Sequence, residues 1–366
     1  MDYYLPVRFF SGRGAVRTHA DALAALGSRC LIVTGGSSAR RSGALEDVTA
    51  ALAACGTAFR IYDGIRPNPS IDSCIEAGRQ AAAFGAEFLI GVGGGSPLDA
   101  AKAAAISAAN PELDAPALYA MRWPHAPLPV ALVGTTAGTG SEVTPVAVIT
   151  DTDGCKRSFR SEQLYAAVAF GDARYTASVP QDITASTGAD ALAHCLESWF
   201  SKTANDVSRA FAAQGASMLL PPLRRVAEGM LPTAEERETL YRASILGGMA
   251  ISVTGTVMPH KLGYYLTETH GVPHGTACAV FLPALLRHAA DCAPELTQEL
   301  LRRMDTDLEQ LTALIRALTP KLGIRLSRAQ IRALLPRWEN APAIGKTVGE
   351  LTAAQLEQIL CALFSE

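Results

Sequence analysis

The sequence predicts a protein in two parts, an α/β domain over residues 1–180 and an all-helical domain over residues 181–366. Short apolar runs alternate with helical segments in the first part, a pattern typical of parallel strands joined by crossover helices. After about Pro180, alanine- and leucine-rich segments with helical periodicity continue almost to Glu366. A chain of 366 residues has room for two such domains.

Four strands are expected in the first part: CLIVT (30–34), AFRIYD (58–63), EFLIGV (87–92) and LPVALVG (128–134). Helices are expected from about Ala44 to Ala54 and from the turn PNPS (67–70) to about Phe84. The segment VAVITDTDGCKRSF predicts a hairpin with its turn at 151–154. Parallel sheets of this kind bind ligands at the carboxyl ends of their strands, so the loops that follow these strands are candidate binding loops.

Two of these loops have a suitable composition. Gly93-Gly94-Gly95-Ser96 follows the third strand and is expected to open a helix at Pro97. Glycines let the backbone approach a diphosphate closely and the helix N-terminus supplies oriented N–H groups, although a tight turn into a helix would also use glycine. The loop TTAGTGSE (135–142) offers hydroxyl groups after the fourth strand. We therefore expect the first loop to bind a phosphate group at the strand ends.

In the helical part, the segment STGADALAHCLESWFS (186–201) predicts an amphipathic helix. Asp190, His194 and Glu197 share one face of it with small side chains, and an apolar stripe occupies the opposite face. Asp190 and His194 are four residues apart, so their side chains project side by side, as two ligands of one metal ion must. Such pairs also occur in ordinary helices, so this pair alone does not establish a site.

Two later histidines favour the metal interpretation. His260 and His274 are fourteen residues apart and would be about 21 Å apart in one continuous helix. Pro273 breaks that helix, so the chain can turn back and bring His274 toward His260. One carboxylate and three imidazoles suit Fe²⁺ or Zn²⁺ with a position open for substrate, and the spacing permits this without requiring it. Other helix breaks are expected at Pro221–Pro222, Pro232, Pro259 and Pro294.

The composition argues against several partner classes. A formal net charge of −3 gives no electrostatic reason to expect a nucleic acid or an anionic membrane. No run of 18 apolar residues exists, and MDYYLPVRFFSG does not resemble a signal peptide. Eight cysteines are scattered without a CxxC pair, and we expect most to be buried and reduced. We expect a cytoplasmic homodimer or larger homo-oligomer that acts on a small molecule.

Four motifs together resemble the iron-containing alcohol dehydrogenases, a family of nicotinamide-dependent enzymes. They are GGGSPLDAAK, TTAGTGSEVTPVAVITD, GADALAHCLESW and HKLGYYLTETHGVPHG, and the resemblance covers the chain to about residue 290. It implies a dehydroquinate-synthase-like architecture, in which a Rossmann-like dinucleotide-binding domain precedes a helical metal-binding domain. It also implies that the metal polarises an alcohol or aldehyde while the nicotinamide exchanges a hydride with the substrate carbon.

The resemblance assigns roles to individual residues. The metal ligands that it implies are Asp190, His194, His260 and His274, with Fe²⁺ expected and Zn²⁺ possible. The residues implied for the coenzyme diphosphate loop are Gly94, Gly95, Ser96 and Asp99, and those for the nicotinamide-side loop are Thr135, Thr136 and Ser141. Asn68 in the PNPS turn and Lys156 in the expected hairpin complete the candidates for contact with the coenzyme.

The chain departs from the family pattern after its third ligand. Many members carry a histidine four residues later that is considered a proton-relay group, and this chain has Tyr264 there. A phenol can hydrogen-bond but is a poor base near pH 7, so we expect the proton to leave through water or another group. His270 is a candidate for that group by proximity, although a histidine at a helix–loop junction is more often a structural hydrogen-bonding residue. Lys261 is either a solvated side chain or a contact for an anionic substrate.

The end of the first strand predicts the coenzyme. Many NAD-preferring members carry an aspartate there, which binds the adenosine ribose and repels a 2′-phosphate. This chain has Gly35, Gly36, Ser37 and Ser38, then Arg40 and Arg41, with no acid before Glu46. These groups can accommodate and pair with a phosphate, so we expect NADP(H) to be favoured over NAD(H), with aldehyde reduction as the physiological direction. Gly35→Asp is then expected to shift the preference toward NADH.

Other functions remain open. A dehydrogenase of the same fold acting on a phosphonate- or phosphate-bearing aldehyde or polyol, or a dehydroquinate-synthase-like lyase, would need basic residues in the cleft. Lys156, Arg157 and Lys261 are the obvious candidates. A non-catalytic binding module on this scaffold is disfavoured, because all four metal positions and the glycine loop are present.

Overall fold

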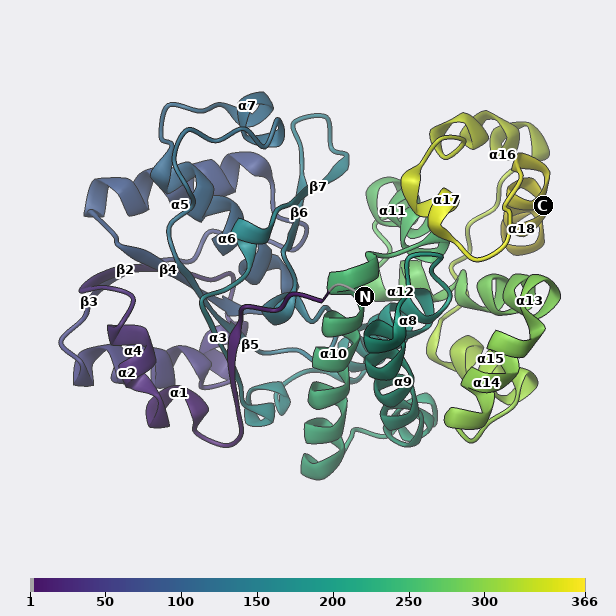
Figure 1. The fold of residues 1–366 in the computed structure, drawn as a ribbon, viewed down its shortest axis with the longest axis horizontal. Coiled ribbons are helices and arrows are strands. Elements are labelled where there is room, and N and C mark those ends of the chain that lie inside the picture. The colour runs from purple at the N-terminus through teal and green to yellow at the C-terminus, as the bar shows by residue number, and fades with distance from the viewer. Residues whose placement is uncertain (1–2, 366) are drawn as a thin grey trace.

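The computed structural model describes residues 3–365. Its N-terminal half is built on a six-stranded parallel sheet, and from Gln181 onward its elements are helices (Figure 1). The expected fold class, an α/β part followed by an all-helical part, is therefore confirmed.

The sheet has the strand order β1-β8-β5-β4-β2-β3. Its strands are β1 (Arg8–Ser11), β2 (Arg29–Val33), β3 (Ala58–Tyr62), β4 (Phe88–Gly93), β5 (Val130–Gly134) and β8 (Val168–Gly171). The sequence predicted β2 to β5 within two residues but did not predict β1 and β8. These two strands have four residues each, too few to show a period. The predicted hairpin is present as β6 (Val146–Thr150) and β7 (Lys156–Arg160).

Helices cover both faces of the sheet. On one face, α5 (Ile71–Phe84) and α6 (Gly95–Ala109) pack together and share a buried cluster with Leu31 and Leu89. On the other face, α1 (Ala15–Thr18), α2 (Ala20–Ala24) and α4 (Ala44–Ala54) share a cluster with Ile32 and Ile90. Successive residues of β2 and β4 thus point to opposite faces, as the pleat of a strand requires. Two short helices, α3 (Ser38–Arg41) and α7 (Ala115–Tyr119), complete this part.

The connections leave a crevice beside β2 and β4. These strands are neighbours, but the chain continues from β2 to an edge strand, β3, and from β4 to β5 on the other side. Loops that depart in opposite directions from adjacent carboxyl ends leave room for a ligand between them. Segments 34–37 and 94–96 follow these two strands, so the structure opens a binding crevice where the sequence predicted one.

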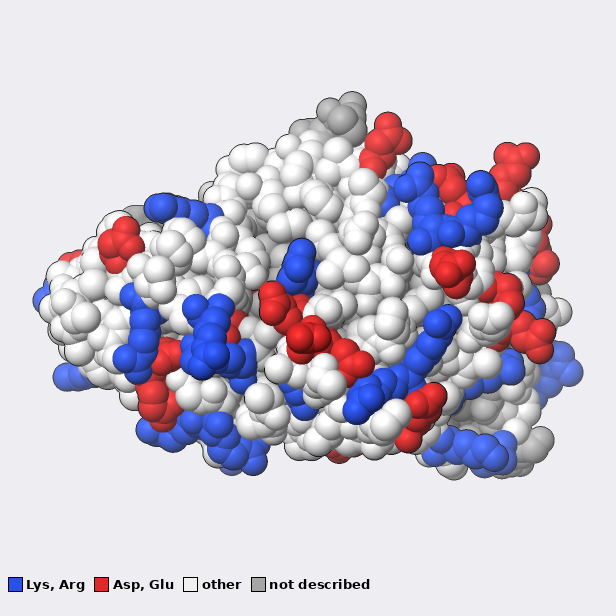
Figure 2. Space-filling view, turned by 90° about the horizontal axis from the view of Figure 1, so that it is seen from below, with Lys and Arg blue, Asp and Glu red and all other residues white. Residues whose placement is uncertain are grey.

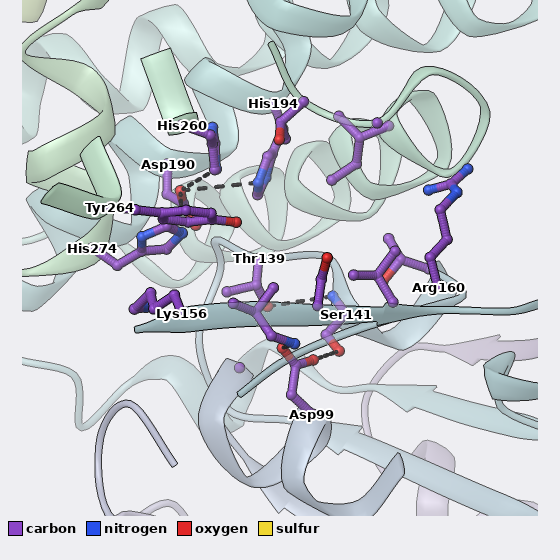
Figure 3. Close-up of a pocket in the computed structure, with 18 of the residues that line it drawn as sticks. Asp99, Thr139, Ser141, Lys156, Arg160, Asp190, His194, His260, Tyr264 and His274 are labelled. Atoms are coloured by element: carbon purple, nitrogen blue, oxygen red, sulfur yellow. Dashed lines mark hydrogen bonds and ion pairs between the residues drawn. The ribbon is translucent and has the colours of Figure 1, made fainter. Parts of the chain in front are cut away.

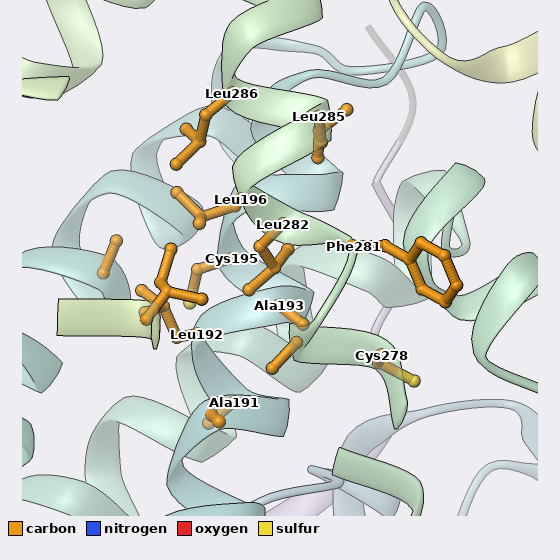
Figure 4. Close-up of a cluster of buried hydrophobic side chains, with 14 of the residues drawn as sticks. Ala191, Leu192, Ala193, Cys195, Leu196, Cys278, Phe281, Leu282, Leu285 and Leu286 are labelled. Atoms are coloured by element: carbon orange, nitrogen blue, oxygen red, sulfur yellow. The ribbon is translucent and has the colours of Figure 1, made fainter. Parts of the chain in front are cut away.

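Helix α8 (Gln181–Trp199) lies at the centre of the helical part. It packs against α9 (Asp206–Ala227), α10 (Ala234–Thr254) and α12 (His274–Ala279). Leu192 and Leu196 on its apolar face share a buried cluster with Leu282 and Leu286 of α13 (Leu282–Cys292) (Figure 4). Burial of each leucine contributes about 2 kcal/mol to folding stability, so this packing fixes α8 and with it the positions of the polar side chains on its opposite face. The other helices are α11 (Met258–His270), α14 (Pro294–Arg303), α15 (Leu308–Leu318), α16 (Arg328–Leu334), α17 (Pro342–Lys346) and α18 (Ala353–Phe364).

Two helix boundaries differ from the expectation. α8 begins at Gln181 instead of near Ser186, because Pro180 serves as its N-cap residue and its carbonyl accepts a hydrogen bond from Thr184 Oγ1 at 2.8 Å. α6 begins at Gly95, two residues before Pro97. Such end shifts are the least predictable feature of a helix.

The expected break at Pro221–Pro222 is wrong, since both prolines lie inside α9. A proline inside a helix costs about 3 kcal/mol, but Leu219, Leu220 and Leu223 around this pair are buried in the core and offset that cost. The remaining expected breaks are correct, because Pro232 precedes α10, Pro273 precedes α12, Pro259 lies in the first turn of α11 and Pro294 begins α14.

The cysteines are less buried than expected. All eight are free, but only Cys30, Cys74, Cys195 and Cys278 are buried, whereas Cys55, Cys155 and Cys292 are exposed. No helix in the part of the chain that the structure describes has the length and hydrophobicity needed to cross a membrane. On the face shown in Figure 2, positive and negative side chains are interspersed over a largely uncharged surface.

Candidate metal and coenzyme site

Two cavities meet between the sheet and the helical part. The strand-end cavity is lined by the loops after β2, β4 and β5 and by residues near the starts of α8 and α12. The histidine cavity lies between the β6–β7 hairpin and helices α8, α10 and α11. Asp190 and His274 line both cavities, so molecules bound in the two cavities can meet at these side chains.

Asp190, His194, His260 and His274 converge at this junction (Figure 3). The Nε2 atoms of His260, His194 and His274 lie 3.4, 3.9 and 4.0 Å from Asp190 Oδ1. Ligands about 2.1 Å from a tetrahedral metal ion are separated by about 3.4 Å. Each imidazole nitrogen thus lies near the ligand spacing from Asp190 Oδ1, and the group of donors whose atoms all lie within 4.8 Å of one another consists of Asp190, His260, His274 and Cys278.

The chemistry of this donor set also fits a metal. Asp190 Oδ1 and His260 Nε2 are buried and have no hydrogen-bond partner among the described residues, which costs about 1–3 kcal/mol per group unless a cation satisfies them. Burial alone would raise the pKa of Asp190, but the neighbouring imidazoles of His194, His260 and His274 outweigh it and hold this pKa well below its usual range. A buried carboxylate kept charged among three imidazoles suits a divalent transition metal.

The tautomers of two histidines follow from their neighbours. His260 Nδ1 lies 2.5 Å from Glu197 Oε1, and His194 Nδ1 lies 3.3 Å from the carbonyl oxygen of Gly138. Both oxygens accept hydrogen bonds, so each Nδ1 carries the proton and each Nε2 presents a lone pair to the cluster. Glu197 is itself held by the N–H of Val257 at 2.7 Å. The sequence placed Glu197 on the correct face but did not predict this orienting contact.

Cys278 is a fifth candidate donor, which the sequence interpretation did not include. Ligand atoms of Cys278, Asp190, His260 and His274 all lie within 4.8 Å of one another. Burial raises the pKa of the free Cys278 thiol to about 11. A bound metal would deprotonate a coordinating thiol, so this pKa does not choose between Cys278 and His194, and His194 is the fourth donor that the family resemblance implies.

Gly275 lets α12 start directly against α8. A Cβ atom at this position would lie 1.9 Å from the carbonyl oxygen of Ser186 and 2.9 Å from Asp190 Cβ. The N–H of Thr276 donates to Ser186 Oγ at 3.1 Å and stabilises the contact between α12 and α8. The turn before His274 thus returns the chain to Asp190, as the sequence permitted.

The two predicted coenzyme loops lie side by side. Gly94, Gly95, Ser96, Thr135 and Thr136 all line the strand-end cavity. A Cβ at Gly95 would lie 2.6 Å from Thr139 Cγ2, and one at Gly94 would lie 3.3 Å from the side chain of Thr136. Glycine at these two positions thus lets the loops pack closely without displacing the threonine side chains, and it places the start of α6 at the cavity.

Asp99 and Ser141 do not line the strand-end cavity, although both were candidates for coenzyme contact. They line the histidine cavity instead. Asp99 Oδ1 accepts a hydrogen bond from Ser141 Oγ at 2.6 Å, and Asp99 Oδ2 accepts one from the N–H of Val148 at 2.8 Å. The fully buried Lys102 donates to the carbonyl oxygens of Ser141 and Thr144 at 2.8 and 2.9 Å. Asp99 and Ser141 thus use hydrogen bonds to join α6 to β6 and to the loop before it.

The loop after β2 lines the strand-end cavity through Gly35, Gly36, Ser37, Ser38 and the neighbouring Arg41. Arg40 is exposed and does not line it, because a change of one residue in α3 turns the side chain by about 100°. Gly35 cannot take the proposed aspartate, since a Cβ there would lie 1.9 Å from the carbonyl oxygen of Ile65. At Gly36 an added Cβ meets no atom within 4 Å, and although φ +57° strains a side chain, aspartate tolerates this conformation better than most residues, so Gly36 is the better position for that test.

Tyr264 lines the histidine cavity, and its ring stacks on His274 with centroids 5.8 Å apart. Burial raises the pKa of its phenol further above neutrality. His270 is exposed, lies 3.3 Å from Tyr265 Oη through Nε2 and lines neither cavity, so it is not brought to the site. Lys261 lines neither cavity.

Three cationic side chains line the histidine cavity: Lys156 and Arg160 on β7, and Lys346 at the end of α17. Only Lys156 was predicted from the sequence. Arg157, which was also considered, forms an ion pair with Asp151 and does not line the cavity. Asn68, at φ +55°, lines both cavities where they join.

Comparison with known proteins identifies relatives along most of the chain. Residues 6–173 match the family model described as iron-containing alcohol dehydrogenase, and residues 184–332 match the C-terminal model of the Fe-containing alcohol dehydrogenase family. Lactaldehyde reductase from Escherichia coli (strain K12) is 32% identical over 305 residues, which cover 82% of this chain and 79% of the relative.

Two solved structures have the same fold. The iron-containing alcohol dehydrogenase from Thermotoga maritima superposes with a TM-score of 0.91 and 31% identity over 99% of each chain. Sulfoacetaldehyde reductase from Bifidobacterium kashiwanohense in complex with NAD⁺ superposes with a TM-score of 0.85 and 29% identity, over 99% of this chain and 98% of the other.

Proposed function

Because this chain belongs to the iron-containing alcohol dehydrogenase family, we propose that it works as an aldehyde reductase with a preference for NADPH. Its relatives are metal-dependent oxidoreductases that interconvert small alcohols and aldehydes. The observation that carries the proposal is the cluster of Asp190, His194, His260 and His274 at the place where two cavities meet. One cavity can hold a dinucleotide and the other a small aldehyde.

In this proposal, Asp190 Oδ1 and the Nε2 atoms of the three histidines hold Fe²⁺, with Zn²⁺ as the alternative. A metal held there would act as a Lewis acid on a carbonyl oxygen, and the coenzyme would supply the hydride. Glu197 and the carbonyl of Gly138 hold His260 and His194 in the tautomers that leave Nε2 free. Such outer contacts position a ligand before the ion arrives.

The strand-end cavity is the proposed coenzyme site. Gly94, Gly95 and Ser96 at the start of α6 would receive the diphosphate, because the N–H groups at a helix N-terminus favour anions. The cavity continues to Asp190 and His274, which would put the nicotinamide end beside the carbonyl carbon. Lys156 and Asn68 line the adjoining part of the histidine cavity, where the nicotinamide half of the coenzyme would come within their reach.

The charges of the strand-end cavity support the NADPH preference. Arg41 and Arg66 line it near the loop after β2, and the only described carboxylate in its lining is Asp190, at the metal cluster. A 2′-phosphate would meet hydroxyl groups of Ser37 and Ser38 and a guanidinium group, with no acid to repel it.

The proton needed to complete aldehyde reduction has no histidine relay in this chain. Tyr264 stacks on His274, and its raised pKa keeps the phenol protonated at neutral pH. We therefore assign Tyr264 a positioning role beside the carbonyl, with water in the histidine cavity as the proton source.

The test is aldehyde reduction with each coenzyme by the metal-loaded enzyme. We expect kcat/KM to be higher with NADPH than with NADH. Arg41→Ala should lower kcat/KM for NADPH by about 10-fold, the effect of losing one charge-assisted contact, and leave NADH nearly unaffected. Arg40→Ala, the adjacent arginine outside the cavity, is the matched control. A preference for NADH in the unmodified enzyme would contradict the coenzyme assignment.

We also propose that the enzyme works in the cytoplasm as a homodimer or larger homo-oligomer. Its free cysteines suit a reducing compartment. The edge strand β1 follows Tyr4, a large side chain that is 54% exposed, and offers a surface to a second copy of the chain. The solution mass from light scattering tests the oligomeric state.

A further inference from the structure

We propose that Arg160 and Lys346 form an oxyanion subsite in the histidine cavity, so that the substrate is an aldehyde carrying a carboxylate, sulfonate or phosphonate group. This inference rests on the proposed aldehyde reductase function and adds the substrate class. Figure 3 shows Arg160 on the side of the cavity opposite His274 and Tyr264, so an aldehyde at the metal cluster would extend toward it.

The histidine cavity has an excess of positive charge. Its lining contains three cations, Lys156, Arg160 and Lys346, and two carboxylates, Asp99 and Asp190. Asp99 lies 4.0 Å from the buried ammonium group of Lys102, and Asp190 belongs to the metal cluster, where a divalent cation would more than neutralise it. Lys156 interacts with Asp99, Asp190 and Glu268, whereas Arg160 and Lys346 have no described carboxylate partner, so these two favour an anion in this partly enclosed cavity.

Arg160 and Lys346 are held near each other at the C-terminal end of α10. Arg160 Nη2 donates to the carbonyl oxygen of Ser252 at 2.7 Å. A Cβ atom added at Gly255, three residues further along, would lie 3.9 Å from Lys346 Nζ. Both charged groups thus lie beside the C-terminal end of α10, although the two residues are far apart in sequence.

A purely structural role leaves most of their hydrogen-bonding groups unexplained. Among the residues that the structure describes, no carboxylate oxygen lies within 4.0 Å of the charged nitrogens of either residue. Ser252 engages only one guanidinium nitrogen, so the other nitrogens of the exposed Arg160 and the ammonium group of the half-buried Lys346 are free to bind water or a ligand. An oxyanion with two or three acceptor oxygens would satisfy both cations at once.

Lys156 is the competing candidate for such an anion, but its position favours the coenzyme. It lies on the same side of the cavity as the metal cluster, with Nζ 5.7 Å from the centroid of the Tyr264 ring. Lys346 also lies beyond residue 332, where the match to the C-terminal family model ends. The proposed subsite thus combines a hairpin residue with one from the C-terminal segment.

The test compares aldehydes that differ in charge. We expect the wild-type enzyme, loaded with metal, to reduce succinate semialdehyde with a higher kcat/KM than its uncharged counterpart butanal. Arg160→Gln and Lys346→Met should each lower the ratio of these two kcat/KM values by about 10-fold, mainly through KM for the anionic aldehyde. Carboxylate-, sulfonate- and phosphonate-bearing aldehydes of equal length then identify which oxyanion fits best.

Lys202→Met is the matched control. Lys202 donates to the carbonyl oxygen of Gly345, directly before Lys346, but does not line the cavity. This variant should keep the wild-type ratio. If Arg160→Gln and Lys346→Met change both aldehydes equally, or if the wild type shows no preference for the anionic aldehyde, the subsite is wrong.

A binding measurement separates this inference from the proposed function. Calorimetry with 3-hydroxypropanesulfonate, in the presence of coenzyme, should detect binding to the wild type and a roughly 10-fold weaker affinity in Lys346→Met. Binding of this kind without turnover of any aldehyde would sustain the subsite and contradict the reductase function. Turnover of butanal without this binding would support the reductase function and contradict the subsite.

Discussion

Gly275 is the residue on which the relative position of the metal ligands depends most closely. Gly275→Ala should separate α12 from α8, because the added Cβ would otherwise lie 1.9 Å from a backbone oxygen. His274 would then move away from Asp190, and we expect metal affinity to fall by at least about 10-fold. The measurement is the metal content after equilibration with a chelator buffer, with circular dichroism to show that the variant is folded.

Gly345→Ala is the control for this prediction, since an added Cβ there meets no atom within 4 Å. It should retain the metal. A Gly275→Ala variant that holds metal as tightly as the wild type would show that α12 can shift without disturbing the ligands.

At the scale of residues, the sequence predicted the four proposed ligands but not their supports. Helical spacing permitted Asp190 and His194 to share a metal, Pro273 permitted His274 to approach His260, and the family resemblance then implied the complete set. Glu197 orients His260 from 63 positions away, and Cys278 is brought near the cluster only by the turn at Gly275. Contacts between residues so far apart in sequence depend on tertiary packing, which local sequence patterns do not predict.

At the scale of elements, periodicity was sufficient where segments are long. The helix that carries Asp190, the hairpin and four of the six parallel strands were predicted. The four-residue strands β1 and β8 were missed, and Pro221–Pro222 were wrongly expected to end a helix that is stabilised by burial. A further error concerns the direction of side chains around α3. Arg40 was expected to contact the coenzyme, but Arg41 lines the strand-end cavity and Arg40 does not.

At the scale of the whole molecule, buried thiols make stability depend on pH. Burial raises the pKa of Cys30, Cys74 and Cys195 to about 12 and that of Cys278 to about 11, so these thiols stay protonated in the folded state. In the unfolded chain they ionise near pH 9. Above that pH the unfolded state binds fewer protons, and the free energy of unfolding should fall by about 1.4 kcal/mol per pH unit for each ionised thiol.

One buried lysine acts in the opposite direction. Burial lowers the pKa of Lys102 to about 8, so the folded state loses this proton first and stability gains from it between about pH 8 and pH 10.5. Four thiols outweigh one lysine, and we predict a net loss of stability between pH 9 and 10. Urea unfolding in the presence of a reductant measures it. Cys30→Val should reduce the slope and the exposed Cys55→Val should not, whereas stability that rises over this range would contradict the prediction.

The two halves of the molecule build the site together. The sheet supplies the strand-end loops, the helical part supplies all four proposed metal ligands, and the hairpin and α17 add the cations. Composition and motifs predicted that the first half supplies the coenzyme loops and the second half the metal ligands. They could not place the cations, because Arg160 and Lys346 become neighbours only when the C-terminal segment docks beside α10.

The most direct test of the central claim is the metal content per chain in the wild type, His194→Ala and Cys278→Ser. We predict about one Fe²⁺ or Zn²⁺ per wild-type chain, the same in Cys278→Ser, and loss of both metal and aldehyde reduction in His194→Ala, with coenzyme binding retained. Metal retained in His194→Ala but lost in Cys278→Ser would identify the Cys278 thiol, and not His194, as the fourth ligand. Full activity of the wild type after its metal has been removed would contradict the account as a whole.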